Sequence, residues 1–212
     1  MLFPSVQFAI FFPIVLALSW ALMSRPALWK PFIVVASYVF YAAANPLFCF
    51  LLGGVTLGNH FAARLIFNAD SERAKRWICA LAVAGDLGVL AVFKYYSFFA
   101  QSIAQALSAV SLGPPLPLLT IALPVGVSFF TFQAISYTVD VRRGLVKPVR
   151  LIDTALYLSF FPHLVAGPSV RAREFLPQLS RPRDPEHVAG SAGLFLVGMG
   201  LVKNVVIADY LG

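Results

Sequence analysis

Long uncharged stretches alternate with short basic loops along most of this chain. Leu2–Ser24, Pro31–Ala63 and Tyr95–Val139 contain no Asp, Glu, Lys or Arg. A helix that crosses a bilayer needs about 20 predominantly apolar residues. Because stretches of this length cannot all be buried in the core of a soluble domain of 212 residues, the pattern predicts an all-α, polytopic transmembrane bundle.

Breaks in the apolar pattern set the expected helix limits. Asn45-Pro46 ends one run, since the residue before a proline disfavours helical backbone, and the proline-rich stretch 113–117 is typical of a loop. We therefore expect transmembrane helices, within a single domain spanning 1–212, at about 5–23, 32–43, 47–67, 77–108, 121–141 and 187–210.

The segment from Leu151 to Leu179 departs from this pattern. Its apolar half-helix, Leu151–Phe161, has about half the length that a bilayer crossing needs and is followed by the breaks Pro162-His163 and Ala166-Gly167-Pro168. Irregular backbone at membrane depth is tolerated only where protein or a water-filled cavity surrounds it. The segment therefore predicts a re-entrant element, 151–170, beside an intramembrane site.

Composition and charge placement agree with this class. The chain is 59% hydrophobic and 12% charged, and its mean hydropathy is +0.82. The net charge of +7 comes from basic residues in short loops rather than on one amphipathic face, so we expect the lipid bilayer and no nucleic acid as a partner. Basic loops alternate with uncharged ones, which by the positive-inside rule places the N-terminus outside. A re-entrant 151–170 keeps Arg171 and Arg173 on the basic side.

Ionisable and polar residues inside the apolar runs are the candidates for a site. Placing Asp86 or Lys94 at the bilayer centre would cost roughly 2.5–3.5 kcal/mol each. Both residues could line a substrate path. Alternatively, Asp86 pairs with a neighbouring helix and Lys94 snorkels to the interface. Ser128, Gln133 and Tyr137 form a polar ridge that suits either a path or helix–helix contacts.

His163, at the break before Ala166-Gly167-Pro168, is the histidine best placed for chemistry. A structural, hydrogen-bonded role is the alternative, because no carboxylate lies near it in the sequence. The chain shows no nucleophile-plus-base constellation, no P-loop and no metal-ligand spacing.

Several strings together resemble the membrane-bound O-acyltransferase (MBOAT) family. They are Leu123–Gln133 (LPVGVSFFTFQ), Phe160–Pro168 (FFPHLVAGP), Glu174–Leu179 (EFLPQL) and the closing Lys203–Leu211. Within the family the chain is most similar to the bacterial branch that contains alginate O-acetylase and the D-alanyl transfer protein of teichoic acids.

The resemblance implies a helical ring around a tunnel through the bacterial inner membrane, crossed by several spans. An acyl donor such as acetyl-CoA or an acyl-carrier thioester would act from the cytoplasmic side, with no bound cofactor. A polysaccharide acceptor and periplasmic or membrane-attached acetylation proteins would complete the transfer outside. The tunnel or substrate path would then include Asp86, Lys94, Ser128, Gln133, Tyr137, His163 and Arg171.

One departure from the family matters most. Family members are about twice as long, and their catalytic histidine lies downstream of the motif that ends here at Asp209-Tyr210-Leu211. We therefore expect an incomplete, N-terminal half of an acyltransferase, inactive alone, with no catalytic residue carried over. His163 stands where relatives have glutamine or histidine, and Asp86 where many have asparagine. A non-enzymatic membrane transporter or scaffold subunit is the alternative function.

Overall fold

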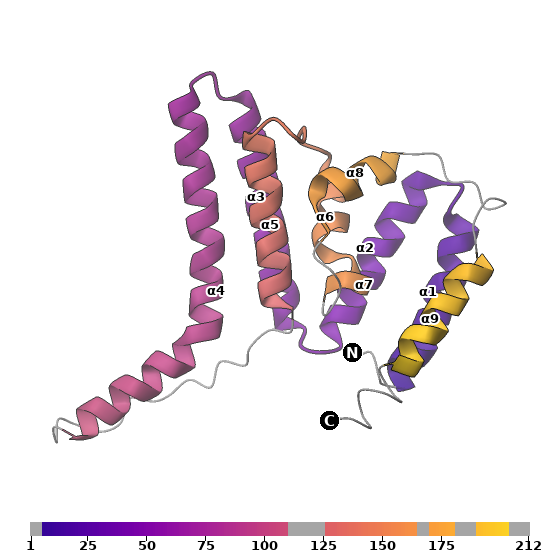
Figure 1. Cartoon of the computed structure of the whole chain (residues 1–212), viewed down its shortest axis with the longest axis horizontal. Coiled ribbons are helices and arrows are strands. Elements are labelled where there is room, and N and C mark those ends of the chain that lie inside the picture. The colour runs from indigo at the N-terminus through magenta and orange to yellow at the C-terminus, as the bar shows by residue number, and fades with distance from the viewer. Residues whose placement is uncertain (1–5, 110–125, 165–169, 181–189, 204–212) are drawn as a thin grey trace. The chain divides into compact units, whose positions relative to one another are not determined.

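All regular structure in the described part of the chain is helical. The computed structural model describes residues 6–109, 126–164, 170–180 and 190–203, and its elements are shown in Figure 1. This confirms the predicted all-helical class. Within these ranges, two helical stretches are long and apolar enough to cross a membrane, Leu47–Asn68 and Glu72–Tyr95. The chain divides into two compact units, one formed by Met1–Phe32 with Arg181–Gly212 and the other by Ile33–Ser180.

The first unit contains α1 (Val6–Leu22), the start of α2 (Pro26–Ala42) and α9 (Gly190–Val202). The α2 helix begins six residues before the predicted 32, because Pro26 suits the first helical position, where no backbone donor is needed. The indole Nε1 of Trp29 donates to Ser19 Oγ over 2.8 Å and ties α2 to α1. The part of the predicted 187–210 helix outside α9 falls outside the described residues.

The second unit is built on three helices that contact one another: α3 (Leu47–Asn68), α4 (Glu72–Ala109) and α5 (Val127–Arg142). The α3 helix matches its prediction, whereas α4 begins five residues before the predicted 77. Ser71 explains the earlier start, because its Oγ accepts a hydrogen bond from the backbone N–H of Arg73 at 3.2 Å. Of the predicted 121–141 helix, residues 121–125 lie outside the described residues.

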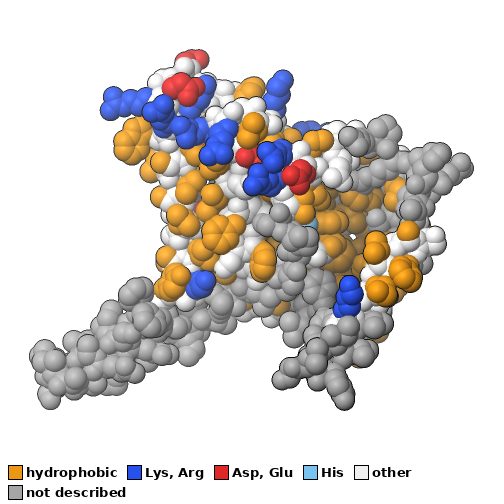
Figure 2. Space-filling model, viewed as in Figure 1, with side chains coloured by type: hydrophobic (Ala, Val, Ile, Leu, Met, Phe, Trp, Pro, Cys, Tyr) orange, Lys and Arg blue, Asp and Glu red, His pale blue; other side chains and the backbone are white. Residues whose placement is uncertain are grey.

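The end of α5 fixes the direction of the following basic loop. Gly144 has φ +72°, the left-handed conformation that favours glycine, and Leu145 N donates to Asp140 O at 2.9 Å. With Gly144 N bonded to Val141 O, this is the Schellman pattern of a helix C-terminus. Figure 2 shows that Lys and Arg side chains gather along one edge of this unit, where the α3–α4 turn and the end of α5 meet.

The segment after Arg150 differs in two respects from its prediction. The predicted half-helix Leu151–Phe161 ends earlier, so that α6 (Leu151–Ser159) and a single turn, α7 (Phe161–Leu164), are separated by a break at Phe160. Pro162 causes the break, because it lacks a backbone donor and its ring would clash with the carbonyl four residues before it.

A further helix, α8 (Ala172–Ser180), follows where we predicted none. Pro177 conceals it in the sequence. Ala172, Leu176 and Leu179 are buried, whereas Arg173 and Gln178 are exposed. This spacing is that of an amphipathic helix packed on α5 and α6, which α8 contacts.

A buried hydrogen-bond network joins the three long helices. Asn59 of α3 donates from Nδ2 to Asp86 Oδ1 of α4 at 2.9 Å, and its Oδ1 accepts from Thr138 Oγ1 of α5 at 2.6 Å. All three side chains are buried. In an apolar surrounding such groups are stable only when they bond one another, so the network fixes the register of α3 against both neighbours.

We expect Thr138→Val to lower the stability of the second unit by about 1 kcal/mol, because it removes the donor to Asn59 without changing the side-chain volume much. Thr131→Val is the matched control. Thr131 is fully buried on the same helix, but its hydroxyl has no hydrogen-bond partner among the described residues, so its loss should leave stability unchanged or raise it. Thermal unfolding in detergent micelles measures the difference, and equal effects of the two changes would contradict the role given to the network.

Candidate functional site

The buried Asp86 lies beside an open groove between α3 and α4. The groove has a volume of about 550 Å³, and its lining includes Gly54, Gly58 and Gly85 as well as Asn59 and Asp86. Asp86 is 5% exposed, and its Oδ2 has no hydrogen-bond partner in the part of the chain that the structure describes. This carboxyl can therefore carry a proton or accept a hydrogen bond from a group that enters the groove.

The polar ridge of α5 is largely internal. Gln133 is buried, and its Oε1 has no partner among the described residues. Tyr137 is fully buried, and its hydroxyl accepts a long hydrogen bond, 3.5 Å, from the backbone N–H of Val149. Ser128 is half-buried near the start of the helix. Unpartnered buried polar atoms of this kind occur where a further chain segment, water or a ligand completes the bonding.

His163 is buried in an aromatic cluster at the break of the 151–180 segment. Its ring centroid lies 5.2 Å from that of Phe160 and 5.6 Å from that of Phe175. Its Nε2 lies 3.2 Å from the carbonyl oxygen of Tyr157. Because a carbonyl oxygen only accepts hydrogen bonds, Nε2 carries the proton. In the neutral ring Nδ1 then has no proton and can itself accept a hydrogen bond. These contacts are those of a side chain that holds its segment in place.

Lys94 and Arg171, the two basic residues of the predicted path, are exposed. The Nζ atom of Lys94 lies 5.7 Å from the ring centroid of Tyr95, a cation–π contact with its own neighbour. The backbone carbonyl of Arg171 accepts the first hydrogen bonds of α8, from the N–H groups of Glu174 and Phe175. Neither side chain bonds to Asp86 or His163.

The structure brings three of the seven predicted path residues, Asp86, Tyr137 and His163, into two groups. Tyr137 and His163 both meet Tyr157, whose ring centroid is 6.3 Å from that of Tyr137 and whose carbonyl accepts the His163 bond. Asp86 belongs to a separate group, with Asn59 and Thr138. Thr138 directly follows Tyr137 on α5, so the two groups adjoin along that helix. Nowhere in the described ranges do three or more His, Cys, Asp or Glu side chains form a cluster that could hold a metal ion.

Two residues that organise these groups were missed in the sequence. Asn59 had a visible signal, since it is an amide within the uncharged run 31–63. Tyr157 had none, because a tyrosine in an apolar half-helix is ordinary. Its importance comes from a contact across the break, where its hydroxyl donates to Val170 O at 2.9 Å.

Comparison with known proteins gives a consistent set of relatives. The chain is 38% identical over 183 residues to "Probable alginate O-acetylase AlgI" of Pseudomonas aeruginosa, a match that covers 84% of this chain. It is 36% identical over 207 residues, 95% of the chain, to the protein of the same name from Azotobacter vinelandii. It is 31% identical over 211 residues to a peptidoglycan O-acetyltransferase of Helicobacter pylori.

These matches cover only part of the relatives. The chain spans 34% of the Pseudomonas protein, 40% of the Azotobacter protein and 38% of the Helicobacter protein. No family model matches the chain, and no solved structure matches it. The membrane-length apolar helices and the identity along most of the chain nevertheless agree, and this membrane protein belongs to the membrane-bound O-acyltransferase family, in its alginate O-acetylase-like branch.

Proposed function

We propose that this chain forms part of an integral membrane O-acyltransferase that transfers acetyl groups toward an exported polysaccharide. The observation that carries the proposal is the identity of 36–38% with proteins named alginate O-acetylase, along 84–95% of the chain. A peptidoglycan O-acetyltransferase and, at 30% identity, a teichoic acid D-alanyltransferase of Lacticaseibacillus rhamnosus are further relatives. All of these names describe acyl transfer to a named polymer, and none describes a transporter or scaffold.

The proposed topology is a multi-pass protein of the bacterial inner membrane with its N-terminus outside. The basic edge formed by the α3–α4 turn and the end of α5 supports a cytoplasmic position for these loops. In this arrangement the segment 151–170 is re-entrant. The bond from the Tyr157 hydroxyl to Val170 O supports it, because it places the chain after the break beside the helix before it.

In the proposed reaction an acetyl-CoA or acyl-carrier thioester donates from the cytoplasmic side. The acceptor is a polysaccharide outside, reached with periplasmic or membrane-attached acetylation proteins. Asp86, Gln133 and Tyr137 are suited to line the path, since they place polar atoms inside the helical unit. Lys94, Ser128 and Arg171 belong to its ends. Acyl transfer also needs a base and groups that stabilise a developing oxyanion, which we assign to parts of the fold beyond this chain.

A chimaera tests the proposed activity. We expect that a Pseudomonas aeruginosa alginate O-acetylase in which this chain replaces the matching 183-residue portion will restore O-acetylation to a strain lacking the enzyme. The ester content of the secreted alginate is the measurement. The 212-residue chain expressed alone serves as the comparison and should restore none. A chimaera that is produced and inserted at the normal level but yields unacetylated polymer would contradict the proposed function. Full activity of the short chain would contradict the assignment of the catalytic base to other parts of the fold.

His163→Gln in this chimaera should retain most acetylation, because a glutamine amide can donate to the Tyr157 carbonyl as Nε2 of the histidine does. His163→Leu removes that donor and should lower the thermal stability of the protein. Near-complete loss of polymer acetylation in the glutamine variant, at unchanged expression, would show that His163 is catalytic.

Asp86→Asn should likewise preserve both stability and acetylation, since the amide oxygen can accept the bond from Asn59 in place of Oδ1. Asp86→Leu leaves the Asn59 amide without this acceptor and makes the groove apolar at that point, so acetylation should fall at least tenfold. Both variants are compared at equal amounts of folded protein, measured by size-exclusion chromatography in detergent. Full activity of a folded leucine variant would remove Asp86 from the proposed path.

A further inference from the structure

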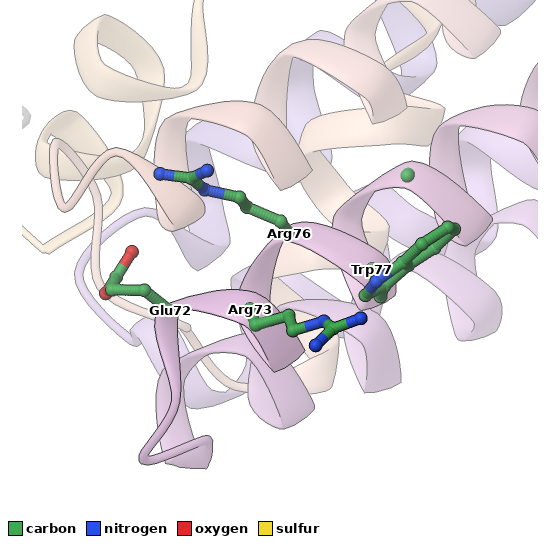
Figure 3. Close-up of a pocket in the computed structure, with 5 residues that line it drawn as sticks. Glu72, Arg73, Arg76 and Trp77 are labelled. Carbon is green, nitrogen blue, oxygen red and sulfur yellow. The ribbon is translucent and has the colours of Figure 1, made fainter.

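A surface depression lies at the start of α4, on a part of the chain that the proposed reaction does not use. It has a volume of about 700 Å³ and is lined by Glu72, Arg73, Arg76, Trp77 and Ala80 (Figure 3). Arg73 and Trp77 are four residues apart and so share a helix face. Figure 3 shows the Arg73 side chain extending toward Trp77, while Arg76 extends in another direction from the helix, so the two guanidinium groups lie on different sides.

Two arginines and one glutamate line this depression, and Glu72 offsets only part of the charge of Arg76. Its one acidic lining residue, Glu72, accepts a hydrogen bond from Lys75 Nζ at 2.9 Å in an ion pair. Arg73 and Arg76 are exposed, and neither forms an ion pair with a described residue. Arg142, at the end of α5, is near enough to interact electrostatically with Glu72 and adds to the local charge. The depression therefore favours an anion.

The surface next to the arginines suits a lipid rather than a soluble anion. Trp77 is 62% exposed and Leu81 is 69% exposed, on a stretch of α4 long and apolar enough to cross a membrane. Exposed apolar side chains continue along the helix to Leu87 and Val92. Arginine followed within one turn by an exposed tryptophan and then an apolar surface is the order of groups expected at the level of lipid headgroups. A free phosphate ion would use only the arginines.

We propose that Arg73, Arg76 and Trp77 form a binding site for an anionic phospholipid. The Arg73 guanidinium, which extends toward Trp77, binds the phosphate, and Arg76 adds positive charge on the other side of the depression. The Trp77 ring packs beside the glycerol region, and the acyl chains lie on the exposed apolar face of α4. Bidentate geometry makes arginine well suited to a phosphate group. The lipid is a structural ligand of the helical unit, and the site does not depend on the proposed acyltransferase activity.

Native mass spectrometry of the protein purified in a non-ionic detergent tests the site. The probes are palmitoyl-oleoyl phosphatidylglycerol, the zwitterionic palmitoyl-oleoyl phosphatidylcholine, and inorganic phosphate as the anion without acyl chains. We expect phosphatidylglycerol to bind at least several-fold more tightly than phosphatidylcholine, and phosphate at equal concentration not to displace it. Equal binding of the two lipids, or displacement by phosphate, would overturn the proposal.

The matched variants are Arg73→Gln with Arg76→Gln, and Arg143→Gln with Lys147→Gln. Each pair removes two positive charges from exposed residues at the same end of the unit, but only the first pair lines the depression. The first should weaken phosphatidylglycerol binding about tenfold or more, since each basic residue near a headgroup contributes about 1 kcal/mol, and the second by about twofold or less. Equal weakening would mean a diffuse charge effect and would refute a defined site.

The Trp77→Ala change distinguishes binding of a lipid from binding of a simple anion in the same assay. It leaves both arginines in place and should still weaken phosphatidylglycerol binding several-fold. If the arginine pair does not yield folded protein, salt titration of the unchanged protein gives the second readout. Binding that is insensitive to salt between low and physiological ionic strength would contradict the role of the arginines.

Discussion

The helical unit 33–180 depends on the pairing of polar groups that have no access to water. Asn59 illustrates the constraint, because its amide bonds Asp86 on one neighbouring helix and Thr138 on the other. In an apolar surrounding an isolated carboxyl, amide or hydroxyl carries a large desolvation penalty, so Asp86 and Thr138 both depend on the Asn59 amide as a partner. Apolar packing alone would let α3 slide or rotate against α4 and α5. The network selects one register, in which Asp86 lies next to the groove.

The same principle holds the broken segment in place. His60 of α3 lies within hydrogen-bond distance, 3.2 Å, of Thr154 in α6, and the Ser37 hydroxyl of α2 accepts from the backbone N–H of Phe161 at 3.2 Å. Tyr157 then bonds Val170 across the break. These contacts join residues far apart in the chain at the point where helical hydrogen bonding is interrupted. Neighbouring helices thus provide hydrogen-bond partners for a short segment in which the helical bonding is broken.

Sequence identity to known proteins establishes the family, whereas the folded structure shows which polar groups lie together. Identity to alginate O-acetylases along most of the chain establishes the family, whereas the chain spans 40% or less of the relatives compared above. The described residues supply a largely apolar groove that Asp86 borders, an aromatic cluster around His163 and a basic edge. None of these is a complete acyl-transfer centre within the part of the chain that the structure describes. Trp77 and its arginines add a separate contact with the lipid phase.

The sequence by itself determined the all-helical class, the position of α3 and the family. Runs of uncharged residues predict membrane helices because charge burial in lipid is so costly, and α3 was located correctly for that reason. The motifs around Phe129 and His163 indicated the family that the comparisons then established. Two predictions from local sequence signals were wrong. No helix was predicted at α8, because Pro177 concealed it, and the predicted start of α4 was too late, because the true start depends on a single capping hydroxyl at Ser71.

Only the tertiary structure decided which polar residues act together. Asp86 pairs with Asn59, 27 residues away, and Thr138 reaches the same amide across 79 residues. Tyr137 and His163 share Tyr157, a residue that carries no sequence signal of its own. Periodicity places a side chain on a face of its own helix, but it does not say which face of another helix lies opposite. That choice is made by packing and by the pairing of most buried polar groups, and both are properties of the folded chain.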